Sequence, residues 1–253
     1  MDKITELAKM IDHSLLHPTM TDQDLEEGCE LAKKYNAASV CIKPYAVPKA
    51  VELLQGSDVA VGTVVGFPQG SPTQEVKVYE TRQACEAGAI EIDMVVNIGK
   101  VLSEDWDYVT DEIKAVTEET HKHGAIVKVI FENDFLGNDQ HKIKLCEICS
   151  KLNANFVKTS TGYGFVKGSD GKYSYQGATH PDLKLMREHS APQVQVKAAG
   201  GVRTLDDLLK VKELGVTRIG ATATATILNE AQKRFGDGSI VIEENTKEDP
   251  SGY

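Results

Sequence analysis

The stretch GAIEIDMVV, residues 88–96, carries the pattern that decides the fold of this chain. A glycine that tolerates the left-handed conformation ends a helix, a small residue follows, and a β-rich apolar run begins. Junctions of the same type begin at Asn36, Gly124, Asn153 and Gly215. Repeated helix-to-strand junctions of this kind predict parallel strands that are joined by crossover helices.

Eight strands are expected when the rest of the chain is compared with this junction. They are predicted at Met10–Asp12, Ser39–Ile42, Val59–Val65, Glu91–Val96, Ile126–Phe131, Phe156–Thr159, Gln193–Ala198 and Thr217–Ile219. Several are continuous apolar runs, which is typical of strands covered on both faces. We therefore predict one α/β domain, a (β/α)8 TIM barrel over residues 1–235 with an N-terminal helix, in preference to a doubly wound open sheet. The acidic segment 236–253 has few apolar residues and is predicted to be a flexible C-terminal tail.

Capping-box motifs predict where three helices begin, because each places an acid or an amide three residues after a hydroxyl side chain. The N-cap residues expected from this spacing are Thr21, Ser71 and Thr204, and Pro72 strengthens the second of them. Residues 162–176 depart from the short connections elsewhere and are predicted to be a long polar loop.

Composition excludes several classes of partner. The formal net charge of −10 argues against nucleic acid and anionic membranes, because both bind basic surfaces. No stretch approaches the roughly 20 apolar residues that span a bilayer, and the N-terminus lacks a signal region, so we predict a cytoplasmic protein. Cys146 and Cys149 form a C-x-x-C within a helical pattern and are interpreted as two buried, reduced thiols. The histidines are scattered, so no metal site is predicted.

Two lysines stand inside apolar β runs, Lys158 in the sixth expected strand and Lys197 in the seventh. A buried lysine without a partner is costly and responds by losing its proton. Carbonyl chemistry needs such an amine, since an ordinary lysine has a pKa of about 10.4 and is protonated near pH 7. A second ammonium group nearby lowers the pKa of the first. For either lysine alone, a salt-bridged strand lysine explains the sequence equally well.

The fourth expected strand adds a carboxylate. Ile92, Met94 and Val96 share one face, so Asp93 is expected on the other face, pointing into the barrel. There it balances the lysines and can relay protons through water. Lys128 on the fifth strand is interpreted as an ion-pair partner of Asp93.

A phosphate site is expected after the last two strands, where many TIM barrels bind phosphate. Gly200 and Gly201 join the seventh strand to a capped helix, with Arg203 close behind. Gly220 and Thr222 lie between the eighth strand and the last helix, whose N-terminus attracts anions.

The segments Phe156–Gly162, Lys197–Thr204, Glu91–Asn97 and 11–13 resemble the deoxyribose-phosphate aldolase family, and the likeness extends over most of the expected barrel. The resemblance implies that Lys158 forms a Schiff base, that Lys197 lowers its pKa, and that Asp93 relays protons.

The same resemblance implies further site residues. Asp12 and Cys41 would line the mouth of the barrel, at the carboxyl ends of the strands. Thr159 and Gly162, beside the reactive lysine, would also be substrate-binding residues there. Some members end in a tyrosine used for proton transfer, so Tyr253 is expected to deliver a proton to the enamine.

The reaction implied is the reversible cleavage of 2-deoxy-D-ribose 5-phosphate to D-glyceraldehyde 3-phosphate and acetaldehyde, without a cofactor. The expected partners are a sugar phosphate and an aldehyde, and a homodimer is left open. Three alternatives stand beside this prediction: another Schiff-base sugar-phosphate aldolase, a metal-dependent or isomerase-type phosphate barrel, and a non-catalytic sugar-phosphate-binding barrel.

Overall fold

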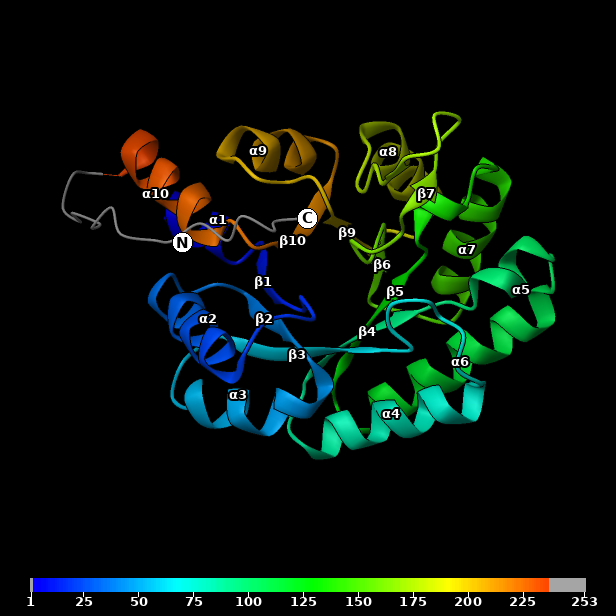
Figure 1. Ribbon diagram of the computed structural model, residues 1–253, viewed down its shortest axis with the longest axis horizontal. Helices are drawn as coiled ribbons and strands as arrows, with labels where there is room; N and C mark the ends of the chain where they lie inside the picture. The colour runs from blue at the N-terminus through cyan, green and yellow to red at the C-terminus, as the bar shows by residue number, and fades with distance from the viewer. Residues whose placement is uncertain (1, 237–253) are drawn as a thin grey trace.

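The computed structural model describes residues 2–236, and their strands form a closed barrel surrounded by helices (Figure 1). Its eight strands are all parallel to their neighbours and follow the order β1-β10-β9-β6-β5-β4-β3-β2. They are β1 (Ile11–Leu15), β2 (Ser39–Ile42), β3 (Ala60–Val65), β4 (Glu91–Val95), β5 (Ile126–Ile130), β6 (Phe156–Lys158), β9 (Gln195–Ala199) and β10 (Val216–Ala221). Every strand predicted from the sequence is present, and the closed barrel excludes the open sheet.

Helices cover the outside of the barrel, as the crossover pattern predicts. They are α1 (Lys3–Ala8), α2 (Asp22–Lys34), α3 (Val47–Leu53), α4 (Gln74–Glu86), α5 (Ile98–Leu102), α6 (Trp106–Lys122), α7 (Asp139–Lys151), α8 (His180–His189), α9 (Leu205–Glu213) and α10 (Thr224–Phe235). The predicted N-terminal helix is α1. Two short 3-10 helices follow β2 and β5, at Pro44–Ala46 and Asn133–Phe135. Within the described residues, no helix combines the length and the apolar character needed to cross a membrane.

Two of the three predicted helix starts are confirmed. Thr21 caps α2 and Thr204 caps α9, and in both cases the capping box is complete. In each, the threonine hydroxyl accepts from a backbone N–H, and the aspartate three residues later accepts from the N–H of the cap.

The predicted start at Ser71 is wrong, because α4 begins at Gln74 with Thr73 as its N-cap and no side-chain cap. The turn before these residues is tightly constrained. Gly70 has a φ of +67° and is so close to the end of β4 that an added Cβ would lie 1.8 Å from the carbonyl oxygen of Val96. Residues 71–73 follow this constrained turn and are not helical.

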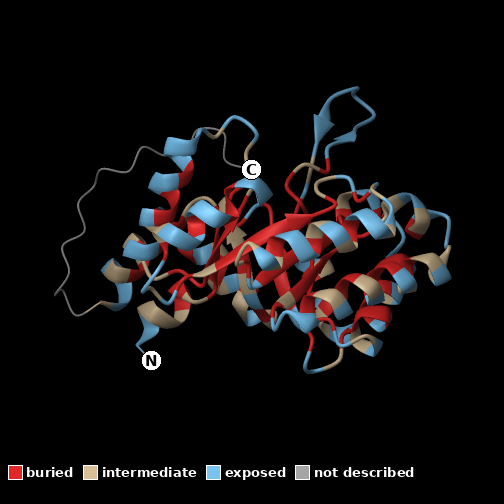
Figure 2. Ribbon diagram, turned by 90° about the horizontal axis from the view of Figure 1, so that it is seen from below, coloured by how far each residue is buried: buried red, intermediate tan, exposed pale blue. Residues whose placement is uncertain are grey.

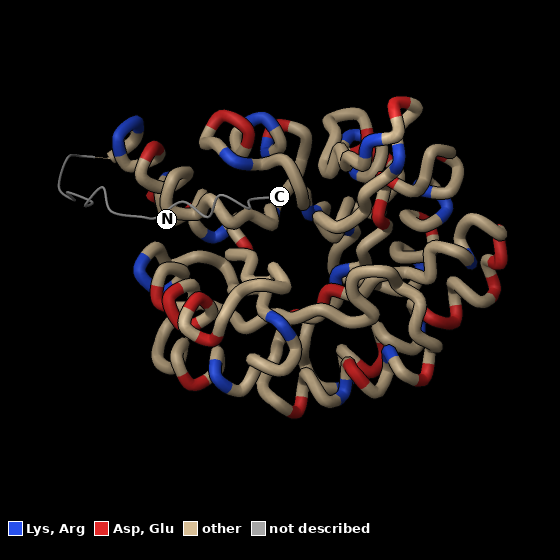
Figure 3. Tube along the Cα trace, in the orientation of Figure 1, with Lys and Arg blue, Asp and Glu red and all other residues tan. Residues whose placement is uncertain are grey.

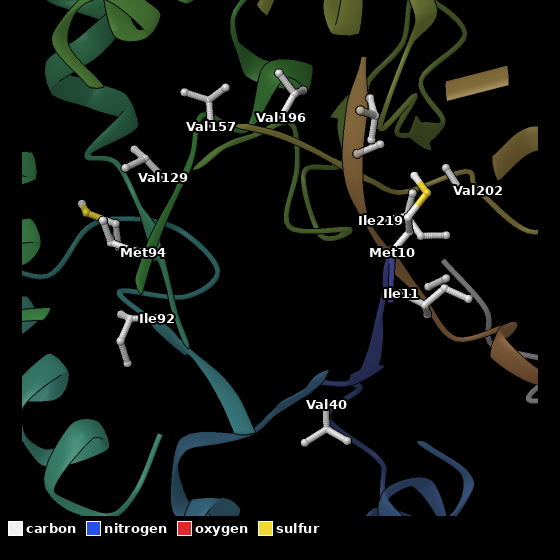
Figure 4. Close-up of a cluster of buried hydrophobic side chains, with 14 of the residues drawn as sticks. Met10, Ile11, Val40, Ile92, Met94, Val129, Val157, Val196, Val202 and Ile219 are labelled. Carbon is white, nitrogen blue, oxygen red and sulfur yellow. The ribbon is translucent and has the colours of Figure 1, made fainter. Parts of the chain in front are cut away.

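The hydrophobic core lies between the strands and the helices. Ile92, Met94, Val129 and Val157 are fully buried, and Figure 4 shows them pointing away from the barrel axis. The burial pattern in Figure 2 agrees, with buried strands and helices that are buried on one face. Because Ile92 and Met94 point outward, Asp93 points into the barrel, as predicted.

Residues 162–176 form the long polar connection that we predicted, but part of it has regular structure. They contain a hairpin of β7 (Val166–Lys167) and β8 (Tyr173–Ser174), which projects from the barrel with exposed side chains (Figure 2). Gly171, with a φ of +80°, belongs to a tight turn in which Gly168 N–H donates to the Lys172 carbonyl at 2.8 Å. The Asp-Gly pair in this turn is a hairpin signal that the sequence already contained.

The C-x-x-C pair behaves as predicted. Cys146 and Cys149 are buried free thiols on α7, and burial raises the pKa of Cys146 to about 12. Thiols with a raised pKa are poor nucleophiles and poor metal ligands.

Candidate active site

A cavity at the carboxyl ends of the strands, here called the mouth, collects most of the predicted site residues. It is lined by Asp12, Ser14, Leu16, Cys41, Lys158, Thr161, Gly162, Lys197, Ala199, Gly200, Gly220, Ala221 and Thr222. These residues come from β1, β2, β6, β9 and β10 or from the segments that follow them. The site is therefore assembled by barrel closure, which brings β1 next to β10.

Asp93 on β4 contacts three lysines at once. Its Oδ2 atom lies 2.7 Å from the Nζ atom of Lys158 and 2.8 Å from that of Lys197. Its Oδ1 atom lies 2.8 Å from Nζ of Lys128. Register explains the meeting, since Asp93 pairs with Lys128 across β4 and β5, and Lys158 pairs with Lys197 across β6 and β9. The predicted trio and the predicted Lys128–Asp93 ion pair are both present.

Asp12 on β1 contacts two of the same lysines and an arginine. Its Oδ2 atom lies 2.5 Å from Nζ of Lys197 and 3.2 Å from Nζ of Lys128. Its Oδ1 atom accepts from Arg218 on β10 and from the Ser39 hydroxyl on β2, the latter at 2.7 Å. The sequence led us to expect Asp12 at the mouth, but it did not reveal these ion pairs.

Arg218 and Glu91 were not predicted from the sequence as site residues. Arg218 Nη1 lies 3.1 Å from a carboxylate oxygen of Glu91, and the guanidinium lies over the ring of Phe156 at 5.5 Å. Glu91 also accepts from Lys128 at 2.6 Å. The sequence does contain a signal for Arg218, because a charged residue stands within the β-rich run of residues 216–221. Its partners cannot be identified without the structure, in which β10 pairs with β1.

The charges of this cluster do not cancel. It holds four cations and three carboxylates, so full ionisation leaves an excess of one positive charge, the members being Lys128, Lys158, Lys197, Arg218, Asp12, Glu91 and Asp93. Lys158 has one carboxylate partner in these pairs, whereas Lys197 has two. Figure 3 shows residues of both signs around the barrel centre as well as on the outer helices. Lys158 is therefore the cation that is least compensated.

The pKa shifts follow from this imbalance. Burial lowers the pKa of Lys158, and the neighbouring charge of Lys197 lowers it further, against the attraction of Asp93. Burial also acts to lower the pKa of Lys197, but Asp12 and Asp93 outweigh it, so that pKa is raised. Lys197 thus remains an ammonium group while Lys158 loses its proton more readily. An amine in this state can attack a carbonyl.

The expected phosphate residues divide into two groups. Gly200, Gly220 and Thr222 line the cavity, close to the start of α10, which has no side-chain cap. Gly201 and Arg203 are exposed in the connection from β9 to α9 and are not among the lining residues.

The remaining predicted residues are also placed. Gly162 and Cys41 line the cavity, and burial raises the pKa of the Cys41 thiol. Thr159 is buried behind the wall, where its hydroxyl donates to the Ala199 carbonyl at 3.1 Å and accepts from the Ala199 N–H at 3.0 Å. Tyr253 lies outside the described residues. Within residues 2–236, no group of three or more His, Cys, Asp or Glu side chains is arranged to hold a metal ion.

Comparisons with known proteins identify the family of this chain. The family model described as DeoC/LacD family aldolase matches residues 6–233. The deoxyribose-phosphate aldolase of Rhodopirellula baltica is 51% identical over 248 residues, covering 98% of this chain and 97% of that protein. The deoxyribose-phosphate aldolase of Clostridium perfringens is 48% identical over 227 residues, covering 90% of this chain and 96% of that protein.

A solved structure shares the fold as well. The tetrameric deoxyribose phosphate aldolase of Aeropyrum pernix superposes with a TM-score of 0.79 at 28% identity, covering 90% of this chain and 92% of that one. Since the family model spans nearly the whole barrel and full-length relatives are about half identical, the chain belongs to the DeoC/LacD family of aldolases.

Proposed function

We propose that this aldolase cleaves 2-deoxy-D-ribose 5-phosphate reversibly to D-glyceraldehyde 3-phosphate and acetaldehyde, through a Schiff base on Lys158. The names of the relatives supply the substrate. The observation that carries the mechanism is that Lys158 is the least compensated cation of its cluster: it is buried at the mouth, pairs with Asp93 alone, and belongs to a group with one cation more than it has carboxylates.

In the proposed reaction the neutral Lys158 amine adds to the aldehyde carbon of the substrate, and water leaves to give an iminium. The iminium withdraws electrons as the C2–C3 bond breaks, and the proton of the C3 hydroxyl passes to water held by Asp93. D-Glyceraldehyde 3-phosphate departs, and an enamine of acetaldehyde remains on Lys158. Protonation of the enamine and addition of water release acetaldehyde and restore the amine.

The neighbouring groups have separate roles in this proposal. Lys197 keeps its positive charge and thereby favours the neutral form of Lys158. Gly200, Gly220 and Thr222 would receive the phosphate, because the backbone can approach an anion closely at the glycines and the N-terminus of α10 attracts it. The role of Tyr253 as proton donor to the enamine stays a prediction.

Cleavage of deoxyribose 5-phosphate, with and without borohydride, tests the proposal. We expect release of D-glyceraldehyde 3-phosphate, irreversible inactivation by borohydride with acetaldehyde, and full activity in the presence of a chelator. Trapping without cleavage would favour another Schiff-base aldolase. Loss of activity to the chelator without trapping would favour a metal-dependent barrel, and binding without turnover would favour a non-catalytic protein.

The phosphate site is tested separately by comparing deoxyribose 5-phosphate with deoxyribose. A specificity constant, kcat/KM, that is similar for both substrates would contradict the proposed site. Light scattering distinguishes the homodimer left open by the sequence from a tetramer such as that of the Aeropyrum pernix relative.

A further inference from the structure

Glu132, the residue that follows β5, adopts an unusual backbone conformation. Its φ is +53°, in the left-handed region, although it is not a glycine. Non-glycine residues in this region are most often Asn or Asp, so a buried glutamate there calls for a functional or structural reason. The contacts of its side chain supply that reason.

The Glu132 carboxylate holds the segment that leaves β6. The Thr161 N–H donates to Oε1 of Glu132 at 3.2 Å, and the Thr161 hydroxyl donates to Oε2. The hydroxyl in turn accepts from the Tyr163 N–H at 2.9 Å. The chain also wraps closely around this carboxylate, since a Cβ at Gly164 would lie 2.7 Å from it. Thr161 and Gly162 line the cavity soon after Lys158 in the chain.

Asp134, two residues further on, holds the segment that returns from the hairpin. Its carboxylate oxygens accept from the N–H groups of Gln176 at 2.5 Å and Gly177 at 3.0 Å. Gly177 lies directly against Gly200, because a Cβ at Gly177 would be 2.8 Å from the Gly200 carbonyl oxygen. That carbonyl also accepts from Ala178 N–H at 3.0 Å. Gly200 itself lines the cavity.

We propose that Glu132 and Asp134 are positioning residues for the aldol reaction: they fix both ends of the 162–176 segment and thereby the cavity wall formed by Thr161, Gly162 and Gly200. This inference rests on the proposed function. The hydrogen-bond donors to both carboxylates are backbone amides and one hydroxyl, so the bonds serve to order the chain. Burial raises the pKa of Glu132 to about 7, against the bonds from Thr161 and the charge of Lys158, whereas the charge of Asp134 adds to the rise.

Two carboxylates are needed because the 162–176 segment, whose two ends they hold, is long and its hairpin is exposed. Each ordered residue costs conformational entropy, and a wall that moves cannot hold a substrate in a reactive geometry. The wall matters for the sugar phosphate, which has to extend from Lys158 toward Gly200. It matters much less for acetaldehyde, which needs only the amine.

The test compares Glu132→Gln and Asp134→Asn with the wild type. Each substitution keeps the shape of the side chain but replaces an acceptor oxygen with an N–H donor. We expect KM for deoxyribose 5-phosphate to rise about tenfold or more, the loss typical of a hydrogen bond to a charged group. The pH profile of trapping by acetaldehyde and borohydride should stay that of the wild type in Asp134→Asn. Glu104→Gln is the matched control, because Glu104 is a glutamate with a φ of +55° that is exposed and bonds to His141.

A double-mutant cycle with Thr161→Val separates positioning from a general loss of stability. If Glu132 acts through Thr161, the double variant should show no higher KM than the worse single variant. If the KM increases of Glu132→Gln and Thr161→Val multiply in the double variant, the inference is overturned. A wild-type KM in Glu132→Gln or in Asp134→Asn would overturn it as well. If circular dichroism shows that Glu132→Gln does not fold, the KM of Asp134→Asn for deoxyribose 5-phosphate tests the inference instead. A wild-type value there would overturn it. Failure of the proposed function is distinguishable, because the wild type itself would then either not be trapped or not cleave deoxyribose 5-phosphate.

Discussion

Lys158 differs from the two lysines beside it in the number of carboxylates that it contacts. Lys128 pairs with Asp12, Glu91 and Asp93, Lys197 pairs with two of these, and Lys158 pairs with Asp93 alone. In a buried site a charge that is not fully compensated is disfavoured, so the proton is lost where the compensation is weakest. The proposal that Lys158 is the nucleophile therefore follows from the number of carboxylates that pair with each lysine.

Lys197→Leu tests this count. The substitution lowers the cluster from four cations and three carboxylates to three of each, so the pKa of Lys158 should rise. We expect the pH at which acetaldehyde trapping is half-maximal to increase by about one unit or more. Lys197→Arg keeps the charge and should keep the wild-type profile. An unchanged profile in Lys197→Leu would leave Lys197 as a substrate contact only.

Arg218→Gln tests the part of the cluster that lies farther from the mouth. Arg218 pairs with Asp12 and Glu91, and its side chain is only 14% exposed. Removing one partner of a buried ion pair should lower the free energy of unfolding by about 3–5 kcal/mol, measured by urea denaturation.

The matched control is Arg234→Gln, since Arg234 pairs with Asp206 and Glu230 on the surface. There we expect little change, because exposed ion pairs are screened by water. Equal losses at the two positions would mean that burial does not govern the strength of these pairs.

At the scale of elements, prediction from the sequence succeeded where the signal was local. The junction pattern located all eight strands, and the capping boxes at Thr21 and Thr204 located two helix starts. The box at Ser71 has the same local form but fails, because α4 begins only at Gln74. The turn before it packs Gly70 against the Val96 carbonyl, a contact between distant segments that a local motif cannot report.

The same limit applies to the candidate site. Lys158, Lys197 and Asp93 could be predicted because charged residues inside apolar strands are conspicuous in the sequence. The pairing of Arg218 with Asp12 spans 206 positions and depends on how β10 closes against β1. The role of Glu132 depends on its backbone conformation and on the path of the hairpin, which no spacing rule gives.

Gly70→Ala tests the close packing of the turn before α4 against Val96. Gly124→Ala is the control, because Gly70 and Gly124 have φ values of +67° and +71°, but a Cβ at Gly124 would meet nothing within 4 Å. Both variants should lose about 1–2 kcal/mol from the left-handed conformation. Gly70→Ala should lose at least about 1–3 kcal/mol more, because the backbone has to shift away from Val96. Similar urea midpoints for the two variants would contradict this explanation.

For the molecule as a whole, barrel closure places the charged cluster at the centre. The free energy of unfolding should therefore depend on pH. Burial acts to raise the pKa of Asp12 and Asp93, but the surrounding cations outweigh it and hold both below the ordinary value of 3.8. Each carboxylate therefore contributes stability above about pH 3.8, and that contribution is lost as the pH falls toward the folded-state pKa.

The free energy of unfolding should accordingly fall below pH 3.8, with a slope of up to about 1.4 kcal/mol per pH unit for each of the two carboxylates. Urea denaturation between pH 2.5 and pH 7, at constant ionic strength and about 25 °C, measures this. A stability that stays constant down to pH 2.5 would show that Asp12 and Asp93 are not ionised partners of the lysines.

The most direct test of the central claim is to locate the adduct. Wild-type enzyme is treated with acetaldehyde and borohydride, digested, and mapped by mass spectrometry to find the lysine that carries an N-ethyl group. The account predicts modification of Lys158 in proportion to the activity lost, and none in a Lys158→Leu variant that retains the wild-type circular dichroism. Modification of Lys197 or Lys128 in its place, or inactivation without any modified lysine, would contradict it.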